Sequence, residues 1–359
     1  MMGNETLPDV YHALPKVDLH RHLEGSLRLS TLREIARRRD YPLPDTGSLP
    51  ALVQVQPEDP PTVPNFLAKF QILRQFYRSP QIIQRLTEEV VEDAAADNVV
   101  YLELHFTPVA LTRQSGFSLA EVMDWVCASA RQAAARNGVT VGLIASANRH
   151  EDPTLAAEVV DLALTRREQG IVGVGLAGNE AEFDAAPFAS IFQTAHAQGM
   201  RVTIHAGEWG GAANVRQAVE DLQADRIGHG VRVLEDPAVI ELARQRGAAF
   251  EVCLTSNIQT GVVPRVEEHP LPAMLAAGLN VSLHTDDPAI SGITLSGEYQ
   301  LACETLGLPM SALKASILAA ASASFLPRAE KERLLARLRR RLVGAGDAVT
   351  GRTAPCVND

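Results

Sequence analysis

Short runs of apolar and β-branched residues recur along the chain, and each is followed by a longer stretch with the periodicity of an amphipathic helix. Near-continuous apolar runs separated by helices are typical of parallel strands that are covered on both faces. Eight such runs predict an α/β fold of the (β/α)8, or TIM barrel, class, in which reactive groups gather at the C-terminal ends of the strands. The runs span residues 16–24, 99–108, 139–148, 170–180, 200–208, 225–231, 248–257 and 280–288.

The segment between the first two runs, residues 25–98, is too long for a simple crossover. It contains a group of prolines between residues 42 and 64, followed by a helical pattern with aromatic residues over 65–78. Because the segment follows the C-terminal end of a strand, it is predicted to lie over the barrel mouth as a lid. We therefore expect a single barrel domain, residues 1–343, that carries this insertion, and a loose C-terminal tail, residues 344–359.

Composition narrows the functional classes. The chain has 359 residues, with 33 Lys and Arg against 43 Asp and Glu, and a formal net charge of -10. This acidic balance, with only short basic runs, argues against binding to the phosphate backbone of nucleic acids. The 4 cysteines form no C-x-x-C pair, and no apolar stretch is long enough to span a membrane. With no signal-peptide pattern at the N-terminus, we expect a soluble cytoplasmic protein.

Ionisable residues alternate with apolar ones in the first run. Asp18, His20, His22 and Glu24 share one face of the predicted strand. Inside a barrel these groups lose their hydration, and a divalent metal ion compensates imidazoles and carboxylates together. Two histidines in an H-x-H pattern are a weak signal alone, and the alternative is a pair of core histidines bonded to barrel carboxylates.

Three other predicted strands end in residues of the same chemistry. The fifth run ends with His205 and Glu208, the sixth carries His229, and the eighth ends with Asp286 and Asp287. Because parallel strands of a barrel end at one mouth, these side chains are expected to converge. Three imidazoles and one carboxylate suit a borderline divalent ion such as zinc, with a position left open for water. The predicted ligands are His20, His22, His205 and Asp286.

The remaining groups at this mouth are those that a hydrolase needs. A metal-bound water falls in pKa from about 15.7 toward about 7, so a neighbouring base has only one weakly held proton to move. Attack on an electron-poor carbon also requires a proton for the atom that receives the electrons, a role for a carboxylic acid with a raised pKa. Glu208 fits that role, and His229 is expected beside the metal without serving as a ligand. Asp287 is expected to point away from Asp286, because adjacent strand residues alternate in direction.

Five runs of sequence, in order and spread over nearly the whole predicted barrel, resemble the adenosine deaminase family. They are residues 15–26 (PKVDLHRHLEGS), 175–180 (GLAGNE), 205–208 (HAGE), 226–230 (RIGHG) and 285–288 (TDDP). The resemblance implies a hydrolase that converts adenosine or 2′-deoxyadenosine to inosine or 2′-deoxyinosine plus ammonia in purine salvage. Its partner would be a small-molecule purine nucleoside, and the sequence predicts no oligomeric state.

The same resemblance implies roles for individual residues. Glu208 would protonate N1 of the purine while a metal-activated water attacks C6, and His229 would orient or deprotonate that water. Asp287 would contact N7, and the backbone N–H of Gly178 would approach N3, which suits a residue without a side chain. The implied ligands of one zinc ion per chain are His20, His22, His205 and Asp286. The implied lid residues, which would close over the base, are Phe66, Leu67 and Phe70.

Two positions bear on the substrate. Glu24 stands where most adenosine deaminases carry Asp, at the position that hydrogen-bonds the ribose 5′-hydroxyl, and adenine deaminases often carry Glu there. Gly228 favours a nucleoside, because adenine deaminases tend to have Asp before this histidine, and residues 291–299 also follow the nucleoside pattern. We therefore expect an adenosine deaminase, with a deaminase of adenine or of 6-amino-6-deoxyfutalosine as the alternative.

Other functional classes fit less well. A two-metal hydrolase on the same barrel usually bridges its metals through a modified Lys on strand four, and residues 178–180 contain none. A ligand-binding barrel without chemistry would not need Glu208 and His229. Zinc deaminases of the H-x-E and P-C-x-x-C type are excluded by the lack of C-x-x-C. Three departures from the family pattern have no predicted role, namely His105, Trp209 and Leu254.

Overall fold

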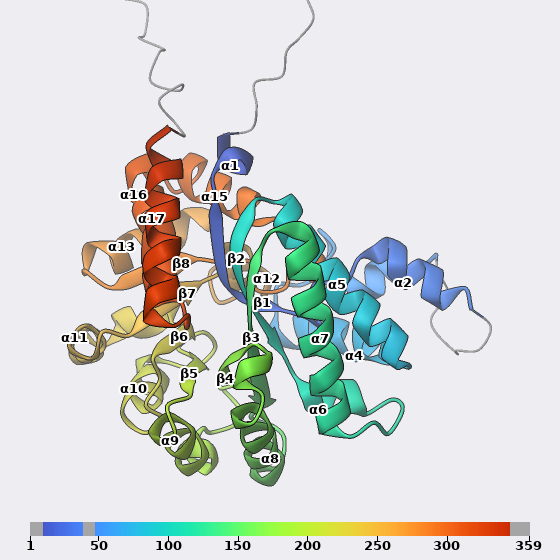
Figure 1. The fold of residues 1–359 in the computed structure, drawn as a ribbon. Coiled ribbons are helices and arrows are strands. Elements are labelled where there is room, and N and C mark those ends of the chain that lie inside the picture. Colours follow the sequence, from blue (N-terminus) through green and yellow to red (C-terminus); the bar gives the residue numbers. More distant parts are fainter. Residues whose placement is uncertain (1–9, 39–46, 345–359) are drawn as a thin grey trace, which may run out of the picture.

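The computed structural model describes residues 10–38 and 47–344. Eight parallel strands form one sheet in the order β1 to β8, so that strands consecutive in sequence are hydrogen-bonded neighbours. Figure 1 shows these strands at the centre with helices around them, which confirms the predicted (β/α)8 barrel. The strands are β1 (Lys16–His22), β2 (Val99–Phe106), β3 (Thr140–Asn148), β4 (Ile171–Ala177), β5 (Arg201–Ala206), β6 (Arg226–His229), β7 (Ala249–Val252) and β8 (Asn280–Leu283).

The barrel closes where β1 meets the segment that follows β8. An isolated parallel bridge joins Arg21 and Asp286. The N–H of Asp286 donates to the carbonyl of His20, and the N–H of His22 donates to the carbonyl of Asp286, each at 2.8 Å. The seam of the barrel therefore runs through three of the predicted metal ligands.

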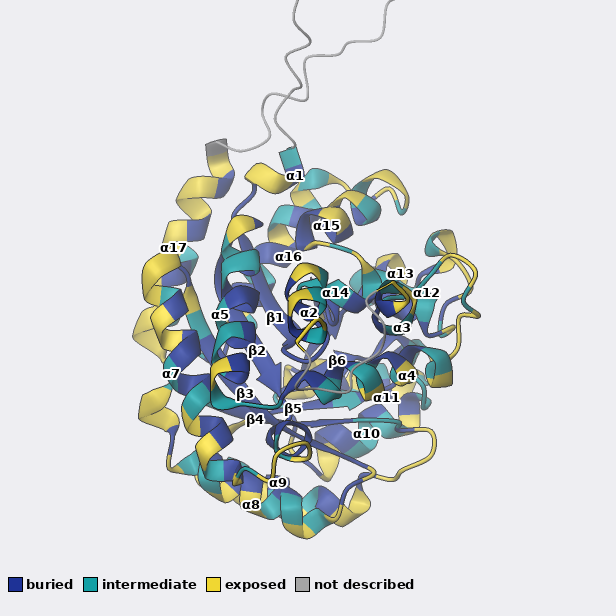
Figure 2. Ribbon diagram, turned by 90° about the vertical axis from the view of Figure 1, so that its right-hand side faces the viewer, coloured by how far each residue is buried: buried dark blue, intermediate teal, exposed yellow. Residues whose placement is uncertain are grey.

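Helices follow the strands and turn their buried faces toward the sheet, as the colouring in Figure 2 shows. The helix α7 (Leu119–Asn137) begins with a capping box, in which Ser118 and Glu121 each accept the backbone N–H of the other. It ends at Gly138, whose φ of 64° is a left-handed conformation that glycine adopts at little cost. The other helices after β2 are α6 (Pro108–Thr112), α8 (Pro153–Leu164), α9 (Ala189–Ala197), α10 (Ala212–Glu220), α11 (Pro237–Arg246), α12 (Leu254–Gln259), α13 (Leu271–Ala276), α14 (Pro288–Ser291), α15 (Leu295–Glu304), α16 (Met310–Ala323) and α17 (Arg328–Gly344).

Both ends of the described chain lie at one end of the barrel, where α1 (Val10–Ala13) and the end of α17 are found in Figures 1 and 2. An Ala-rich segment near the C-terminal end of the chain forms α16. No helix in the described ranges is both long and apolar enough to cross a membrane. The tail predicted for residues 344–359 lies outside the described residues from 345 onward.

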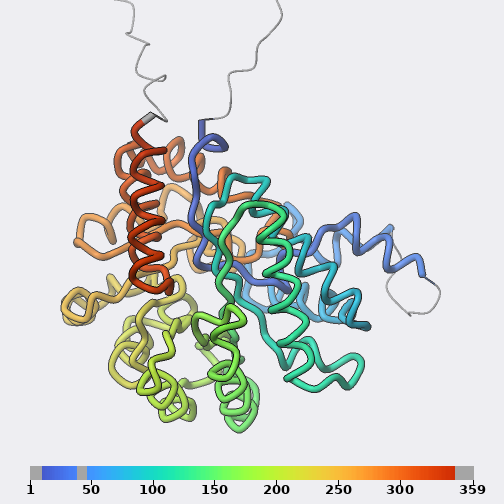
Figure 3. Tube along the Cα trace, in the orientation of Figure 1, coloured from blue at the N-terminus to red at the C-terminus, as the bar shows by residue number. Residues whose placement is uncertain are grey.

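The insertion between β1 and β2 lies to one side of the barrel, as the blue-to-cyan part of the tube in Figure 3 shows. The helix predicted over residues 65–78 ends earlier than expected, at Leu73, and the chain then continues as a 3-10 turn. The elements of this segment are α2 (Leu29–Ala36), α3 (Leu49–Val53), α4 (Val63–Leu73), η1 (Arg74–Phe76) and α5 (Pro80–Ala96).

Polar contacts hold the insertion in place. The Nζ of Lys69 in α4 donates to the carboxylate of Asp59 at 2.8 Å. The Nε2 of Gln54, just after α3, donates to the carbonyl of Ala289 at 2.9 Å, in the short helix after β8. The insertion is therefore attached to the C-terminal face of the barrel, where the predicted site residues lie.

Candidate active site

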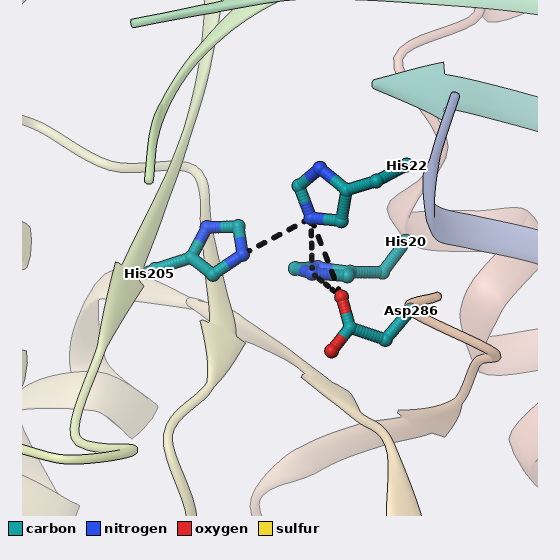
Figure 4. A group of neighbouring side chains, drawn as sticks. All are labelled: His20, His22, His205 and Asp286. Atoms are coloured by element: carbon teal, nitrogen blue, oxygen red, sulfur yellow. Dashed lines mark hydrogen bonds and ion pairs between the residues drawn. The ribbon is translucent and has the colours of Figure 1, made fainter. Parts of the chain in front are cut away.

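Four side chains from three parts of the barrel bring their ligand atoms together (Figure 4). The Nε2 of His22 lies 3.2 Å from the Nε2 atoms of both His20 and His205. The Oδ1 of Asp286 lies 3.4 Å from the Nε2 of His20 and of His22. One ligand atom from each residue lies within 4.8 Å of the other three. Converging imidazole nitrogens need a proton or a cation between them, and this donor set fits zinc.

A carboxylate orients the ring of His20. The Nδ1 of His20 lies 2.7 Å from the Oε2 of Glu251, which directs its Nε2 toward the other donors. Burial would lower the pKa of His20, but hydrogen bonds to Asp286 and Glu251 outweigh it and raise the pKa to about 10. Burial lowers the pKa of His22 to about 4. A metal ion would therefore compete with protons for the nitrogens of this cluster.

Glu251 belongs to an ion network enclosed by the barrel. Its second oxygen accepts the Nε–H of Arg226, whose Nη2 donates to Glu103 at 2.6 Å. The hydroxyl of Tyr101 donates to the other oxygen of Glu103, also at 2.6 Å. Burial opposes ionisation of Glu251, yet the charge of Arg226 and the hydrogen bond from His20 hold its pKa well below the usual range. The network thereby fixes the carboxylate that orients the first metal ligand.

Asp286 lies beyond the end of β8 in a left-handed conformation with φ of 59°, which is uncommon for a residue other than glycine. The hydroxyl of Ser256 donates to its Oδ2 at 2.7 Å and leaves Oδ1 facing the histidines. The expectation that Asp287 points away from Asp286 is wrong, because both carboxylates line one cavity. Strand alternation does not apply here, since neither residue belongs to β8. Burial and the charge of Asp286 raise the pKa of Asp287 well above its usual range.

Glu208 follows β5 in a tight turn that a second carboxylate holds. The carboxylate of Glu180 accepts three consecutive backbone N–H groups, from Gly207 at 2.9 Å, Glu208 at 2.6 Å and Trp209 at 2.9 Å. Burial, followed by the charges of Asp286 and Glu180, raises the pKa of Glu208 well above its usual range. Glu208 is therefore suited to hold a proton at neutral pH.

His229 faces both Glu208 and Asp286. Its Nε2 lies 3.5 Å from the Oε2 of Glu208 and 3.9 Å from the Oδ2 of Asp286. The Nδ2 of Asn257 lies 3.2 Å from Nδ1 of His229 and, as a donor, assigns the ring proton to Nε2. The Oδ1 of the same amide faces His269 at 3.2 Å. Burial lowers the pKa of His229 to about 3, so the ring is neutral and presents an N–H to the cavity.

A cavity of about 510 Å³ connects these groups with the insertion. It is within the size range of small-molecule sites, roughly 300–1,000 Å³. Every predicted site residue except His20, which is buried behind the cavity, contributes to its lining. The members from α4 are Phe66, Leu67 and Phe70.

Glu24 and Gly178 also line this cavity. The Oε1 of Glu24 accepts the N–H of Thr107 at 2.8 Å, whereas its Oε2 is buried without a hydrogen-bond partner. Burial raises the pKa of Glu24. Gly178 has a φ of 95°, and a Cβ there would lie 3.3 Å from the backbone nitrogen of Arg149. The Oε2 of Glu24 is therefore free for a ligand, and at Gly178 no side chain stands between the backbone and the cavity.

Sequence reasoning missed the residues that support the site from behind. Charged residues in the middle of apolar strands, Glu103 and Glu251, were a readable signal for a buried ion network. Glu180 carried no such signal, because its partners are backbone groups on the next strand's loop. Of the three departures from the family pattern, Trp209 lines the cavity. The other two, His105 and Leu254, are buried in the packing.

Comparison with known proteins identifies the family. A profile described as adenosine deaminase matches residues 15–341. An adenosine deaminase of Erwinia tasmaniensis is 37% identical over 327 residues, which cover 90% of this chain and 98% of the relative.

Solved structures agree with the sequence comparison. An amidohydrolase from Burkholderia ambifaria with bound Zn has a TM-score of 0.88 at 28% identity and covers 98% of this chain and 97% of its own. The adenine deaminase of Arthrobacter aurescens has a TM-score of 0.82 at 28% identity, with coverage of 91% and 98%. Arabidopsis ADAL complexed with IMP has a TM-score of 0.83 at 29% identity, with coverage of 94% and 99%. The chain belongs to the adenosine deaminase family.

Proposed function

We propose that this protein is a zinc-dependent adenosine deaminase that hydrolyses adenosine or 2′-deoxyadenosine to the inosine product and ammonia. The observation that carries the proposal is the position of Glu208. Its buried carboxyl, with a pKa raised mainly by burial, shares one cavity with the donor cluster and with His229. A protonated acid beside a metal site is what hydrolytic removal of an aromatic amino group requires.

One zinc ion per chain would be held by His20, His22, His205 and Asp286. When bound there, zinc lowers the pKa of a water molecule and makes it a nucleophile at neutral pH. The fit rests on the chemistry of the donors, three imidazole nitrogens and one carboxylate oxygen. The zinc in the Burkholderia relative supports the same choice of metal.

Glu208 donates its proton to N1 of the purine, which leaves C6 electron-poor and open to water. Glu180 holds the backbone of Glu208 through three N–H bonds, so the acid does not have to be ordered during the reaction. His229 directs its Nε2–H toward the space beside Glu208 and Asp286, where it orients the attacking water. The attacking water gives up two protons: one leaves with the amino group as ammonia, the other restores the acid form of Glu208, and the ring keeps the oxygen at C6.

The base and the sugar take the remaining polar groups of the cavity. Asp287, protonated because burial and Asp286 raise its pKa, donates to N7. The backbone N–H of Gly178 donates to N3, and the free Oε2 of Glu24 accepts a ribose hydroxyl. The apolar cover of the base is formed by Phe66, Leu67 and Phe70 of α4.

The proposal extends to the molecule as a whole. Residues 1–343 act as one catalytic domain with the lid insertion 25–98, and the enzyme works in the cytoplasm on a small nucleoside. No nucleic-acid partner is required, given the net charge of -10. Each statement follows from the sequence patterns described above.

The test is a spectrophotometric panel with the zinc-loaded protein. The substrates are adenosine, 2′-deoxyadenosine, adenine, N6-methyladenosine and 6-amino-6-deoxyfutalosine, and metal content is measured in parallel. We expect deamination of the nucleosides, one zinc per chain, loss of activity on chelation and recovery with added zinc. Activity that survives complete metal removal would contradict the zinc proposal.

Adenine is the second candidate substrate, and one residue favours it. Glu24 projects a longer carboxylate into the space of the ribose than Asp would, and a solved adenine deaminase is among the similar structures. Faster turnover of adenine than of adenosine would replace the nucleoside by the free base as substrate.

A further inference from the structure

The aromatic face of α4 ends in an arginine. Phe66, Phe70 and Arg74 are spaced four residues apart, so they lie along one face of the helix and the turn that continues it. All three line the catalytic cavity. The guanidinium of Arg74 lies 5.7 Å from the centre of the Phe70 ring, a position that keeps its charge over the aromatic face.

Within the described chain, the side chain of Arg74 has no charged partner, unlike those of Arg28 and Arg85 in the same insertion. Among the described residues it makes no hydrogen bond or ion pair, and its Nε is buried without a partner. Arg28 and Arg85, by contrast, each form an ion pair at 2.7 Å, with Asp93 and Glu34 respectively. A half-buried guanidinium without a partner is expensive, and an anionic ligand group is the partner that satisfies its planar donors best.

The surroundings of Arg74 define where such a group would lie. Arg74 lines the same cavity as Glu24 and His150, and its positive charge acts on both side chains. Glu24 is the group placed at the ribose, so Arg74 stands at the sugar end of the cavity, away from the base. His150 adds a second nitrogen donor to this lining, and the carboxylate of Glu182 lies at its exposed rim.

We propose that Arg74 forms a subsite for an anionic group attached to the 5′ side of the nucleoside, with His150 as a second donor. This inference rests on the proposed deamination and specifies the substrate class further. The ligand chemistry is a phosphate or a carboxylate, since both match the fork of a guanidinium. Such a substrate has no free 5′-hydroxyl, so Glu24 would accept another ribose hydroxyl while the anion lies at Arg74.

The test compares kcat/KM for adenosine, adenosine 5′-monophosphate and adenosine-5′-carboxylic acid, using zinc-loaded wild-type enzyme and three variants. The variants are Arg74→Gln, Arg74→Lys and the control Arg78→Gln, which removes a nearby charge that does not line the cavity. In wild-type enzyme, at least one anion is expected to have a kcat/KM no lower than that of adenosine. Arg74→Gln should lower the ratio of anion to adenosine by about 10-fold or more, as for loss of a charged hydrogen bond.

The conservative variant and the control show whether the effect is specific to the guanidinium of Arg74. Arg74→Lys should retain part of the ratio, and Arg78→Gln should retain all of it. A loss confined to the phosphate compound assigns a phosphate subsite, and a loss confined to the carboxylate assigns a carboxylate subsite. An unchanged ratio in Arg74→Gln, or an equal loss for adenosine and both anions, would overturn the inference.

Product binding separates this inference from the proposed function. Calorimetric titrations with inosine and inosine 5′-monophosphate need no turnover, and Arg74→Gln should weaken binding of the monophosphate by about 10-fold relative to inosine. If no purine is deaminated, the proposed function fails, and the titrations still decide the subsite. The subsite would be excluded if wild-type enzyme bound the two products equally and also showed no preference for adenosine-5′-carboxylic acid.

Discussion

The carboxylate of Glu180 accepts the backbone N–H of Glu208 at 2.6 Å and holds the residues on either side of it in the same way. Two acidic side chains thus act at one turn: Glu180 holds its backbone in place, and Glu208 supplies the reactive carboxyl. Glu180→Gln should lower kcat by roughly 100-fold, the size of effect expected when a catalytic group is misplaced by about 1 Å. An amide offers only one acceptor oxygen, so at least one buried N–H loses its partner, at a cost of about 1–3 kcal/mol.

Activity, zinc content and urea unfolding should be measured together for this variant. Zinc content should stay unchanged, because Glu180 contacts none of the four donors. Glu220→Gln, at the exposed end of α10, is the control and should behave as wild type. Full activity in Glu180→Gln would show that the turn does not need its carboxylate.

Glu208→Gln should abolish most of the activity while the protein keeps one zinc per chain. The amide has nearly the same shape but cannot donate a proton to the purine, and removal of a general acid costs roughly 100- to 10,000-fold. Steady-state kinetics with adenosine and metal analysis on the same sample check this outcome. Unchanged turnover would remove Glu208 from the mechanism.

The pH dependence of kcat should show a loss on the alkaline side. Burial and neighbouring charges raise the pKa of Glu208, so its acid form is present below that raised pKa and is lost as pH rises through it. His229 should add no loss near pH 6 to 7, since burial lowers its pKa to about 3 and it stays neutral there. A profile of kcat that rises toward high pH would contradict the assignment of Glu208 as the acid.

Glu251→Gln should weaken zinc binding although the residue is not a ligand. The Nδ1 of His20 would lose its charged partner, and loss of such an orienting partner lowers metal affinity by roughly 10- to 100-fold. The unfolding free energy should also fall by about 3–5 kcal/mol, because, among the described residues, Arg226 would keep Glu103 as its single charged partner. Competition with a chelator and chemical denaturation measure the two effects, and Glu241→Gln on the surface of α11 is the control.

Gly228→Ala should also act on the metal. A Cβ at this position would lie 2.8 Å from Cε1 of His20 and 3.2 Å from Cγ of His205, so two ligand rings must shift. We expect at least about a 10-fold loss of zinc affinity, by analogy with loss of other ligand-orienting contacts. Gly297→Ala is the matched control, since its nearest contact would be an ordinary 3.6 Å. Equal zinc affinity in both variants would show that the ligand rings move freely.

Periodicity was sufficient to predict the barrel and the convergence of the donors, because parallel strands place their last residues at one mouth regardless of side-chain detail. The same reasoning failed at Asp286 and Asp287, which lie past the end of β8. There the left-handed φ of Asp286 replaces strand alternation and turns both carboxylates into one cavity.

The supporting contacts were beyond sequence reasoning for a different reason. Arg226 reaches Glu103 and Glu251 across the barrel interior, and Asn257 faces both His229 and His269. Such contacts depend on the strand register and on how the loops pack, neither of which follows from local pattern. That Arg74 has no charged partner among the described residues likewise becomes visible only when its neighbours are placed.

The seam at Arg21 and Asp286 connects the metal site with closure of the barrel. His20 and His22 lie on one side of this seam and Asp286 on the other, although these residues are far apart in the sequence. An ion bound by all four donors would therefore hold the two sides of the seam together. A partial chain that stops before Asp286 lacks one of the four donors. An ion held by the four donors would thus couple metal binding to closure of the sheet, and its release would remove one link across the seam.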